Sequence, residues 1–582
     1  MAQLLELIQK KTFAFTFAGI AILYLFLFVT LLPHDSIWIS DEGNRIAAVR
    51  AYAETSQRYL PDPFSGLEQV PGQGLRAYPK PYFIQEKDGQ WRSAYSAFFP
   101  WTCSFLYKAA GRPGLVLLPV IAGLLSILFA GLIAKTLGLN DRKASLVMLL
   151  CAFGTPFLFY SGVFLETTTA AFFATAGIWT VLKAMDSPEE PVPLFCGGLL
   201  IGVSSLFREE GFILAFGIFL GIAVTRFSWK RLIVFSAGAW AVILPLMIFN
   251  WQDSGSVFGM HSVVYSAIGA VRSNPFFTAK LRDYLMYLTL LCMPVPILNS
   301  VPAILLAAGG IFCSWRKTAS CAEAISYPLI AGLCLFSSFH NLFGDTRGVF
   351  IFQSLLDHLP VIAACIFSIP FLFRNNDRKV RFLAWVAAAG VLIPPAMLNE
   401  ELIGMFWGGR HFMNIIPVVC VLTVALLSSD RLTRIAKYGI CALIFASVVA
   451  NAIGYGVLSY KKNFSQELFD ALDRQEIKTI VTDVFWLPEE LAWLPRDTRI
   501  IFMTDADSLE RVAALCNANG IIDFHAVLGQ YSRVLSNESI ARVFQTCHGT
   551  PGKLFRKERL KFFTVQIFHI VLPPRDKPLK KD

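Results

Sequence analysis

The chain has 582 residues, of which 55% are hydrophobic and 16% charged, and its formal net charge is +10. Soluble domains carry roughly 25% charged residues, so this composition excludes an ordinary soluble protein and indicates a chain whose solvent is largely lipid. The lysines and arginines fall in short connectors between apolar runs and after residue 459, without a basic stripe, which argues against a nucleic-acid partner.

Apolar runs long enough to cross a bilayer begin near the N-terminus. Lys10 and Lys11 precede an apolar run with no cleavage site, which predicts a retained first helix. Backbone polar groups in hydrocarbon must bond within their own segment, so these runs are expected to be helices. The sequence predicts about 13 spanning helices, at 12–32, 114–138, 144–164, 167–184, 191–207, 211–225, 232–249, 298–315, 325–342, 349–373, 381–398, 412–428 and 437–458.

Lysine and arginine recur in every second connector between these runs, and the other connectors hold few cations. Short loops rich in these residues stay on the cytoplasmic side of a membrane. The alternation predicts a multi-pass protein of a bacterial inner (plasma) membrane, with a cytoplasmic N-terminus and a periplasmic C-terminal domain. The cation-rich connectors hold Lys10 and Lys11; Lys135, Arg142 and Lys143; Lys183; Arg226, Lys230 and Arg231; Arg316 and Lys317; Arg374, Arg378, Lys379 and Arg381; and Arg431, Arg434 and Lys437.

From about residue 459 the composition becomes that of a soluble domain. Short strands are expected at 478–482, 499–504, 521–524 and 562–572, with helices at 466–474, 488–494 and 507–517. Alternating strands and helices are typical of a small α/β layer domain. The expected fold is therefore an all-α polytopic membrane bundle at 1–458, with a long first outer loop at about 33–113, and an α/β extramembrane domain at 459–582.

Acids, arginines and histidines gather near the helix ends of the face that holds few cations. A solvated loop is the ordinary explanation for any one of them, and Glu42 also fits a capping role at the start of a helix. Their recurrence favours function, because ionisable groups close to hydrocarbon are costly and usually functional. The set comprises Asp41, Glu42, Glu166, Arg208, Glu210, Asp345, Arg347, Arg410 and His411.

A sugar transfer at a membrane surface needs side chains of these kinds. A donor sugar on a polyprenyl phosphate needs a carboxylate to take the acceptor's proton, and cations or a metal to stabilise the departing phosphate. Asp41 is the candidate base, and Glu166 is a candidate to support it or to hold a metal. Arg347 and Arg410 are candidates to pair with phosphate, whose oxygens match the guanidinium fork. The sequence contains no plain metal cluster and leaves open whether a divalent metal takes part.

Four segments resemble the GT-C class of integral membrane glycosyltransferases, which includes protein O-mannosyltransferases and the lipid A aminoarabinose transferase. The acidic pair Asp41-Glu42 follows the first helix. Residues 93–111 contain Tyr95 and Pro100 and resemble the Tyr/Pro-rich end of the family's first loop. Residues 250–259 resemble a common loop of these proteins, and Trp407-Gly-Gly-Arg410-His411 resembles their entry to a late helix.

The resemblance implies an inverting transfer from a polyprenyl-phosphate sugar to a glycan, lipid or protein acceptor, with Asp41 as general base. The Trp-Trp-Asp motif of oligosaccharyltransferases is missing, which argues against transfer to asparagine of proteins. The predicted catalytic residues are Asp41, Glu42 and Glu166. The predicted substrate-binding residues are Tyr95, Arg208, Glu210, Asp345, Arg347, Arg410 and His411.

Three other functions compete with this one. A transporter or flippase of lipid-linked sugars would concentrate ionisable groups near the middle of the bilayer, and Asp357 and His358 are the residues that fit it. A non-catalytic scaffold would not depend on Asp41. An enzyme like an O-antigen ligase would rely on arginine and histidine of the outer face more than on an acid after the first helix.

Overall fold

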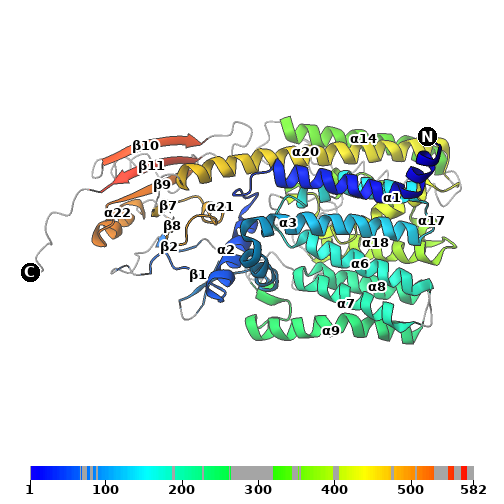
Figure 1. The fold of residues 1–582 in the computed structure, drawn as a ribbon, viewed down its shortest axis with the longest axis horizontal. Coiled ribbons are helices and arrows are strands. Elements are labelled where there is room, and N and C mark those ends of the chain that lie inside the picture. The colour runs from blue at the N-terminus through cyan, green and yellow to red at the C-terminus, as the bar shows by residue number, and fades with distance from the viewer. Residues whose placement is uncertain are drawn as a thin grey trace, which may run out of the picture. The chain divides into compact units, whose positions relative to one another are not determined.

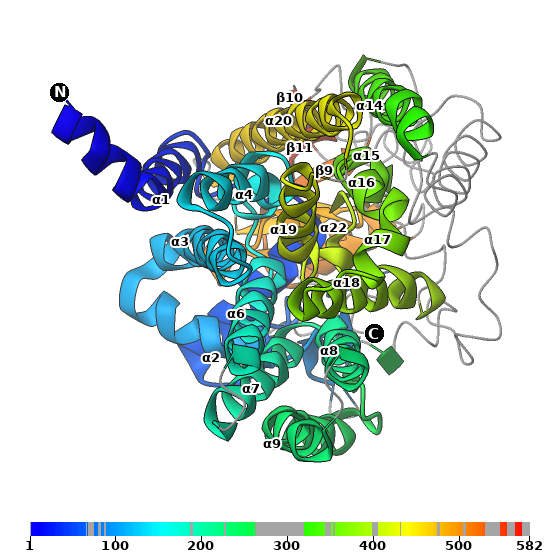
Figure 2. The ribbon, with the colours of Figure 1, turned by 90° about the vertical axis from the view of Figure 1, so that its right-hand side faces the viewer.

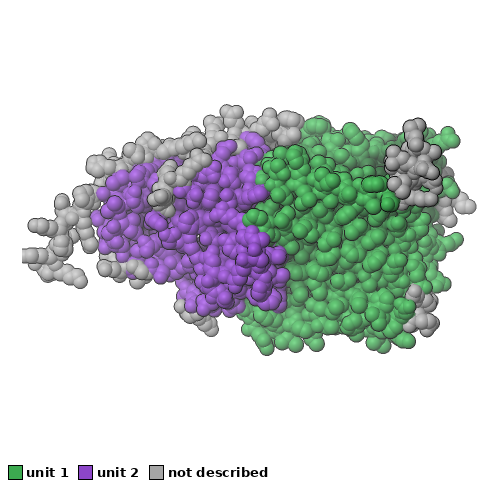
Figure 3. All heavy atoms as spheres, in the orientation of Figure 1, with its two compact units in different colours: residues 1–32, 113–459 green, residues 33–112, 460–582 purple. Residues whose placement is uncertain are grey.

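The chain divides into two compact units, residues 1–32 with 113–459 and residues 33–112 with 460–582 (Figure 3). The first unit is helical and the second contains the larger sheet. The computed structural model describes residues 2–65, 67, 75–78, 83–86, 89–186, 190–225, 228–260, 262–263, 319–343, 351–352, 355–397, 406–430, 432–473, 478–504, 508–529, 548–555 and 565–572.

The first unit is a bundle of helices, several of which lie side by side (Figures 1 and 2). Helix α3 begins, and α20 ends, among residues of the second unit. The helices are α1 (Ala2–Leu25), η1 (Phe26–Thr30), α3 (Phe98–Thr136), α4 (Asp141–Phe153), α5 (Phe157–Tyr160), α6 (Thr167–Asp186), α7 (Pro191–Phe207), α8 (Glu210–Thr225), α9 (Trp229–Ser254), α14 (Ala319–Phe343), α15 (Leu355–His358), α16 (Ile362–Phe367), α17 (Ile369–Phe373), α18 (Arg378–Met397), η3 (Arg410–Phe412), α19 (Ile416–Leu427) and α20 (Arg434–Asp473); the strands β5 (Ile351–Phe352) and β6 (Phe406–Trp407) pair in parallel.

Five described helices are long and apolar enough to cross a membrane, and four shorter helices are also apolar. These helices agree with the predicted polytopic bundle, although the number of about 13 spanning helices is not confirmed. The predicted span 298–315 lies outside the described residues. The five long segments are Lys11–Thr30, Phe98–Thr136, Trp229–Ser254, Arg378–Ala396 and Arg434–Asp473.

Two predicted spans are interrupted. The helix expected at 144–164 stops at Phe153, and a short helix resumes after Pro156. The helix expected at 349–373 is broken into α15, α16 and α17, with Pro360 between the first two. Proline lacks the N–H that a continuing helix needs, and it disfavours helical geometry in the residue before it. Apolar length alone does not report such breaks.

Helices α7 and α9 approach each other at glycines. A Cβ on Gly198 would lie 2.2 Å from the carbonyl oxygen of Phe235, and a Cβ on Gly238 would lie 2.1 Å from that of Phe195. Only glycine permits backbones to come this close, which is a common way for membrane helices to pack without a hydrophobic driving force.

The second unit is built on a six-stranded sheet of order β10-β11-β9-β7-β8-β2. Strand β7 is parallel to both of its neighbours, and β2, from the predicted first outer loop, pairs antiparallel with β8. The predicted strands at 478–482 and 499–504 correspond to β7 and β8. The elements are β2 (Leu75–Arg76), β7 (Thr479–Thr482), α21 (Leu487–Glu490), β8 (Arg499–Met503), α22 (Ser508–Ala518), β9 (Asp523–Gly529), β10 (His548–Phe555) and β11 (Val565–Val571).

The first outer loop also forms its own small sheet and one helix. Strands β1 (Tyr59–Leu60), β4 (Trp91–Ser93) and β3 (Phe83–Gln85) pair antiparallel in that order. Helix α2 (Ser40–Thr55) packs on this sheet, whose buried side chains include Trp91. The arrangement places the end of β4 beside the first turns of α2.

Candidate active site

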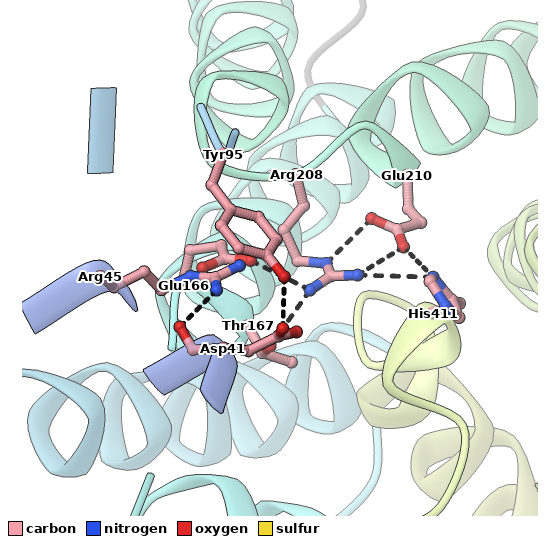
Figure 4. A network of polar contacts seen from close by, with 8 residues as sticks. All are labelled: Asp41, Arg45, Tyr95, Glu166, Thr167, Arg208, Glu210 and His411. Atoms are coloured by element: carbon pink, nitrogen blue, oxygen red, sulfur yellow. Dashed lines mark hydrogen bonds and ion pairs between the residues drawn. The ribbon is translucent and has the colours of Figure 1, made fainter. Parts of the chain in front are cut away.

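The acidic pair Asp41-Glu42 lies in the first turn of α2, where Ile39 is extended and the helix begins. A helix N-terminus stabilises negative charge because its N–H groups point outward. Asp41 is only 5% exposed. The Tyr95 hydroxyl donates to its carboxylate, and the Arg45 guanidinium donates to its backbone oxygen over 2.7 Å (Figure 4). The same guanidinium lies 4.1 Å from the centre of the Tyr95 ring.

Tyr95 is held in place by its own loop. The Ser93 hydroxyl, at the end of β4, donates to the side-chain oxygen of Asn44 and accepts from the Tyr95 N–H over 3.2 Å. Asn44 lies one turn after Asp41 on α2. The structure therefore brings the predicted residues Asp41 and Tyr95 together.

Glu42 makes different contacts. Its carboxylate accepts from the backbone N–H of Trp38 over 2.6 Å and from the Lys462 ammonium over 3.3 Å. Lys462 also donates to the carbonyl oxygen of Ser36, so the two side chains together hold the segment that leads into α2. This geometry favours a positioning role for Glu42 over direct catalysis.

Four buried charged residues near α2 are not among the site residues that the sequence predicts. Lys461 donates to the carbonyl oxygen of Ile37 and to Glu490, and Glu489 precedes Glu490 in α21. The pairs Lys461-Lys462 and Glu489-Glu490 are visible as charged doublets, one at the end of a spanning run and one after Pro488. Their spacing from Asp41 exceeds 400 residues, so only the folded chain identifies their neighbours.

In the first unit, Arg208 links the two other predicted acids. Arg208 is the C-cap residue of α7, and its backbone is extended. Its guanidinium donates to Glu166 over 3.3 Å and to both carboxylate oxygens of Glu210, over 2.9 and 2.7 Å (Figure 4). It also donates to the Thr167 hydroxyl over 3.3 Å. All three guanidinium nitrogens of Arg208 therefore donate hydrogen bonds to side chains of this chain.

His411 completes this group. Its Nδ1 lies against the carboxylate of Glu210 and within 3.4 Å of Arg208. Burial lowers the pKa of His411 to about 4, with Arg410 and Arg208 opposing its charged form and Glu210 favouring it. Arg410, the preceding residue in η3, is 7% exposed. The predicted residues Asp345 and Arg347 lie outside the described residues.

The first unit also buries the two residues that fit a transporter. Asp357 is 1% exposed and accepts from the Ser337 hydroxyl over 2.9 Å, and His358 is 2% exposed. The backbone oxygen of His358 accepts from Asn451 over 2.8 Å. These contacts satisfy polar groups within the bundle, as packing in hydrocarbon requires.

A resident metal ion would need several ligating side chains close together. Within the described ranges, no three His, Cys, Asp or Glu side chains gather closely enough to hold an ion. Glu166, the predicted candidate ligand, pairs one carboxylate oxygen with the Arg208 cation over 3.3 Å. Among the described residues, Glu166 is therefore part of an ion pair and not of a cluster of metal ligands.

No protein-family model and no curated protein matches the sequence. The structure does match solved structures, and the fold they define is that of GT-C membrane glycosyltransferases. The oligosaccharyltransferase of Archaeoglobus fulgidus in its apo form aligns with a TM-score of 0.51 and 13% identity, over 89% of this chain and 70% of its own. ArnT of Cupriavidus metallidurans in the apo state aligns with a TM-score of 0.50 and 11% identity, over 96% and 98%. At these identities the likeness shows the fold.

Proposed function

We propose that the chain is a glycosyltransferase that moves a sugar from a polyprenyl-phosphate donor to a glycan, lipid or protein acceptor. The reaction takes place at the outer face of a bacterial inner membrane. The fold supports the class of enzyme, although a fold alone does not determine a reaction. The observation that carries the proposal is the buried carboxylate of Asp41, placed at a helix N-terminus with the Tyr95 hydroxyl bonded to it.

Asp41 acts as the general base. As the acceptor hydroxyl attacks the anomeric carbon, its proton passes to Asp41 and the new glycosidic bond forms. The bond between the anomeric carbon and the phosphate oxygen breaks, and the electron pair leaves on the polyprenyl phosphate. A single displacement of this kind inverts the anomeric centre. An ionised carboxylate accepts several hydrogen bonds at once, so the bond from Tyr95 is compatible with this role.

The departing phosphate needs positive charge. Arg410 is proposed to pair with it, and Arg347 keeps the same role proposed from the sequence. Arg208 donates to Glu166 and Glu210, so it is proposed to position these acids. Glu166 and Glu210, with His411, then offer oriented groups to the hydroxyls of a substrate. Asp345 is proposed as a further substrate-binding residue.

The test is Asp41→Asn. The purified full-length protein is incubated with a polyprenyl-phosphate sugar, and release of polyprenyl phosphate is measured together with product. The variant keeps the size of the side chain and loses the base, so turnover is expected to fall by at least ~10²-fold. Thermal unfolding of the same preparation checks that the variant is folded.

The matched control is Asp62→Asn, which changes an exposed acid of the same loop and is expected to retain activity. Full activity of Asp41→Asn would exclude Asp41 as the base. If the wild type translocates the lipid-linked sugar across vesicle membranes but transfers no sugar, and Asp41→Asn loses this translocation, the flippase is favoured instead.

A further inference from the structure

Helix α21 packs directly on the first turn of α2. A Cβ added to Gly43 would lie 2.0 Å from the backbone oxygen of Glu489 and 2.9 Å from its Cβ. Gly43 is two residues after Asp41, so Glu489 is held against the turn that carries the proposed base. Only a residue without a Cβ fits at position 43 this close to α21.

The carboxyl group of Glu489 is buried without a hydrogen bond. The residue is 1% exposed, and neither carboxyl oxygen has a hydrogen-bond partner among the described residues. The next residue, Glu490, is equally buried and pairs with Lys461. An isolated ionised carboxylate in such surroundings is far more costly than a neutral one, and it usually takes up a proton.

The charged groups around Glu489 come from three helices. Asp41 of α2 and Glu490 of α21 act on Glu489 directly, and Glu489 in turn acts on Tyr78. Glu42 of α2 and Lys461 of α20 act on Glu490, and Lys462 of α20 acts on Lys461. Each cation has its own contact: Lys461 pairs with Glu490, Lys462 pairs with Glu42, and Arg45 bonds the backbone of Asp41.

Together, these surroundings raise the pKa of Glu489. Burial raises the pKa of Glu489 well above its usual range, and the negative charges of Asp41 and Glu490 raise it further. The backbone of Glu489 itself lowers this pKa, but by less than burial raises it.

We propose that Glu489 is a neutral carboxylic acid in the folded protein, so that the Asp41 and Glu489 carboxyl groups together carry one negative charge, which Asp41 holds. Glu489 packs on Gly43, two residues from Asp41, and the charge of Asp41 acts on it. Two carboxyl groups that interact in this way do not both ionise readily. A second negative charge here would repel an anionic donor. The catalytic part rests on the proposed function, whereas the protonation of Glu489 does not.

The proposal predicts the sign of a pH effect on stability. An unfolded glutamate has a pKa of about 4.3. If the folded pKa is raised, the folded protein holds a proton that the unfolded chain releases at neutral pH. The stability from this proton is complete below the unfolded pKa and is lost as pH rises through the folded pKa.

The experiment compares Glu489→Gln with the wild type as full-length protein in detergent. Glutamine mimics the protonated acid, so the variant is expected to be at least as stable near neutral pH. Its advantage in Tm is expected to grow as the pH rises. The infrared carbonyl band of a protonated carboxyl group should be present in the wild type and weaker in the variant.

Sugar transfer supplies the second readout. Beyond the pKa of Glu489, kcat/KM of the wild type is expected to fall about tenfold per pH unit, and this alkaline decline should be absent from Glu489→Gln. The acid side of the profile should not change. The control is Glu490→Gln, which leaves Lys461 without its carboxylate and is expected to lose stability at every pH.

An unchanged infrared band, or a loss of stability in Glu489→Gln that matches Glu490→Gln, would overturn the protonation. An alkaline decline shared by wild type and Glu489→Gln would overturn the positioning role. If the wild type transfers no sugar, the proposed function fails, while Tm and the infrared band still decide the protonation state.

Discussion

The Tyr95 hydroxyl donates a hydrogen bond to the carboxylate of Asp41, across 54 residues of the first outer loop. Asp41 comes from the first turn of a helix and Tyr95 from the residues after a short strand. The pair exists because α2 packs on the small sheet that ends at Ser93. A base whose charged form receives a hydrogen bond is stabilised in that form.

Tyr95→Phe removes this bond and keeps the ring beneath Arg45. Hydrogen bonds to charged groups contribute about 1.5–3 kcal/mol, so the acid side of the kcat/KM profile is expected to move up by about one pH unit or more. The measurement is sugar transfer as a function of pH. Tyr59→Phe, which removes a hydroxyl bonded to Glu86 in the same loop, is the control and should not shift the profile. A Tyr95→Phe profile equal to that of the wild type would show that the bond does not tune the base.

Arg208→Gln removes the cation shared by Glu166 and Glu210. Breaking a buried ion pair on one side costs about 3–5 kcal/mol because it leaves uncompensated charge. We therefore expect a clear fall in Tm. The double variant Arg208→Gln/Glu210→Gln should recover part of the loss.

The control for Arg208 is Lys478→Gln. The side chains of Lys478 and Asp497 are 71% and 61% exposed, and such surface pairs contribute at most about 1 kcal/mol. Equal small effects of Arg208→Gln and Lys478→Gln on Tm would contradict the buried network.

The buried His411 is expected to make the stability of the folded protein depend on pH in the acidic range. Its ordinary pKa of about 6.5 is lowered to about 4 by burial. The unfolded chain then binds a proton that the folded chain does not, so stability is full above pH 6.5 and falls as the pH drops toward 4. His411→Gln should remove up to about 3 kcal/mol of this acid-induced loss, measured as unfolding midpoints at several pH values. His569→Gln, at a half-exposed histidine, is the control. An identical acid profile in His411→Gln and wild type would contradict a buried neutral imidazole.

The membrane class and many element boundaries follow from local properties of the sequence. The sequence predicts a helix at 191–207, and the structure has one at Pro191–Phe207, because apolar length is a property of the segment itself. Strands β7 and β8 were predicted from short strand-like runs that alternate with helices. Strand β10 was not, and α20 continues to Asp473 where a separate helix at 466–474 was expected. Residues 459–465, which lie between the two predicted helices, are helical and join them into α20.

The sequence by itself determined a polytopic membrane protein, the place of Asp41-Glu42 after the first helix, and which polar residues deserved a chemical explanation. Only the tertiary structure decided how they are used: Tyr95 bonds Asp41, Glu42 faces Lys462, and Arg208 joins Glu166 to Glu210. It also brought Glu489 against the first turn of α2. Hydropathy and helix length depend on neighbouring residues, whereas hydrogen bonds and the desolvation of a charge depend on atoms contributed from hundreds of residues away.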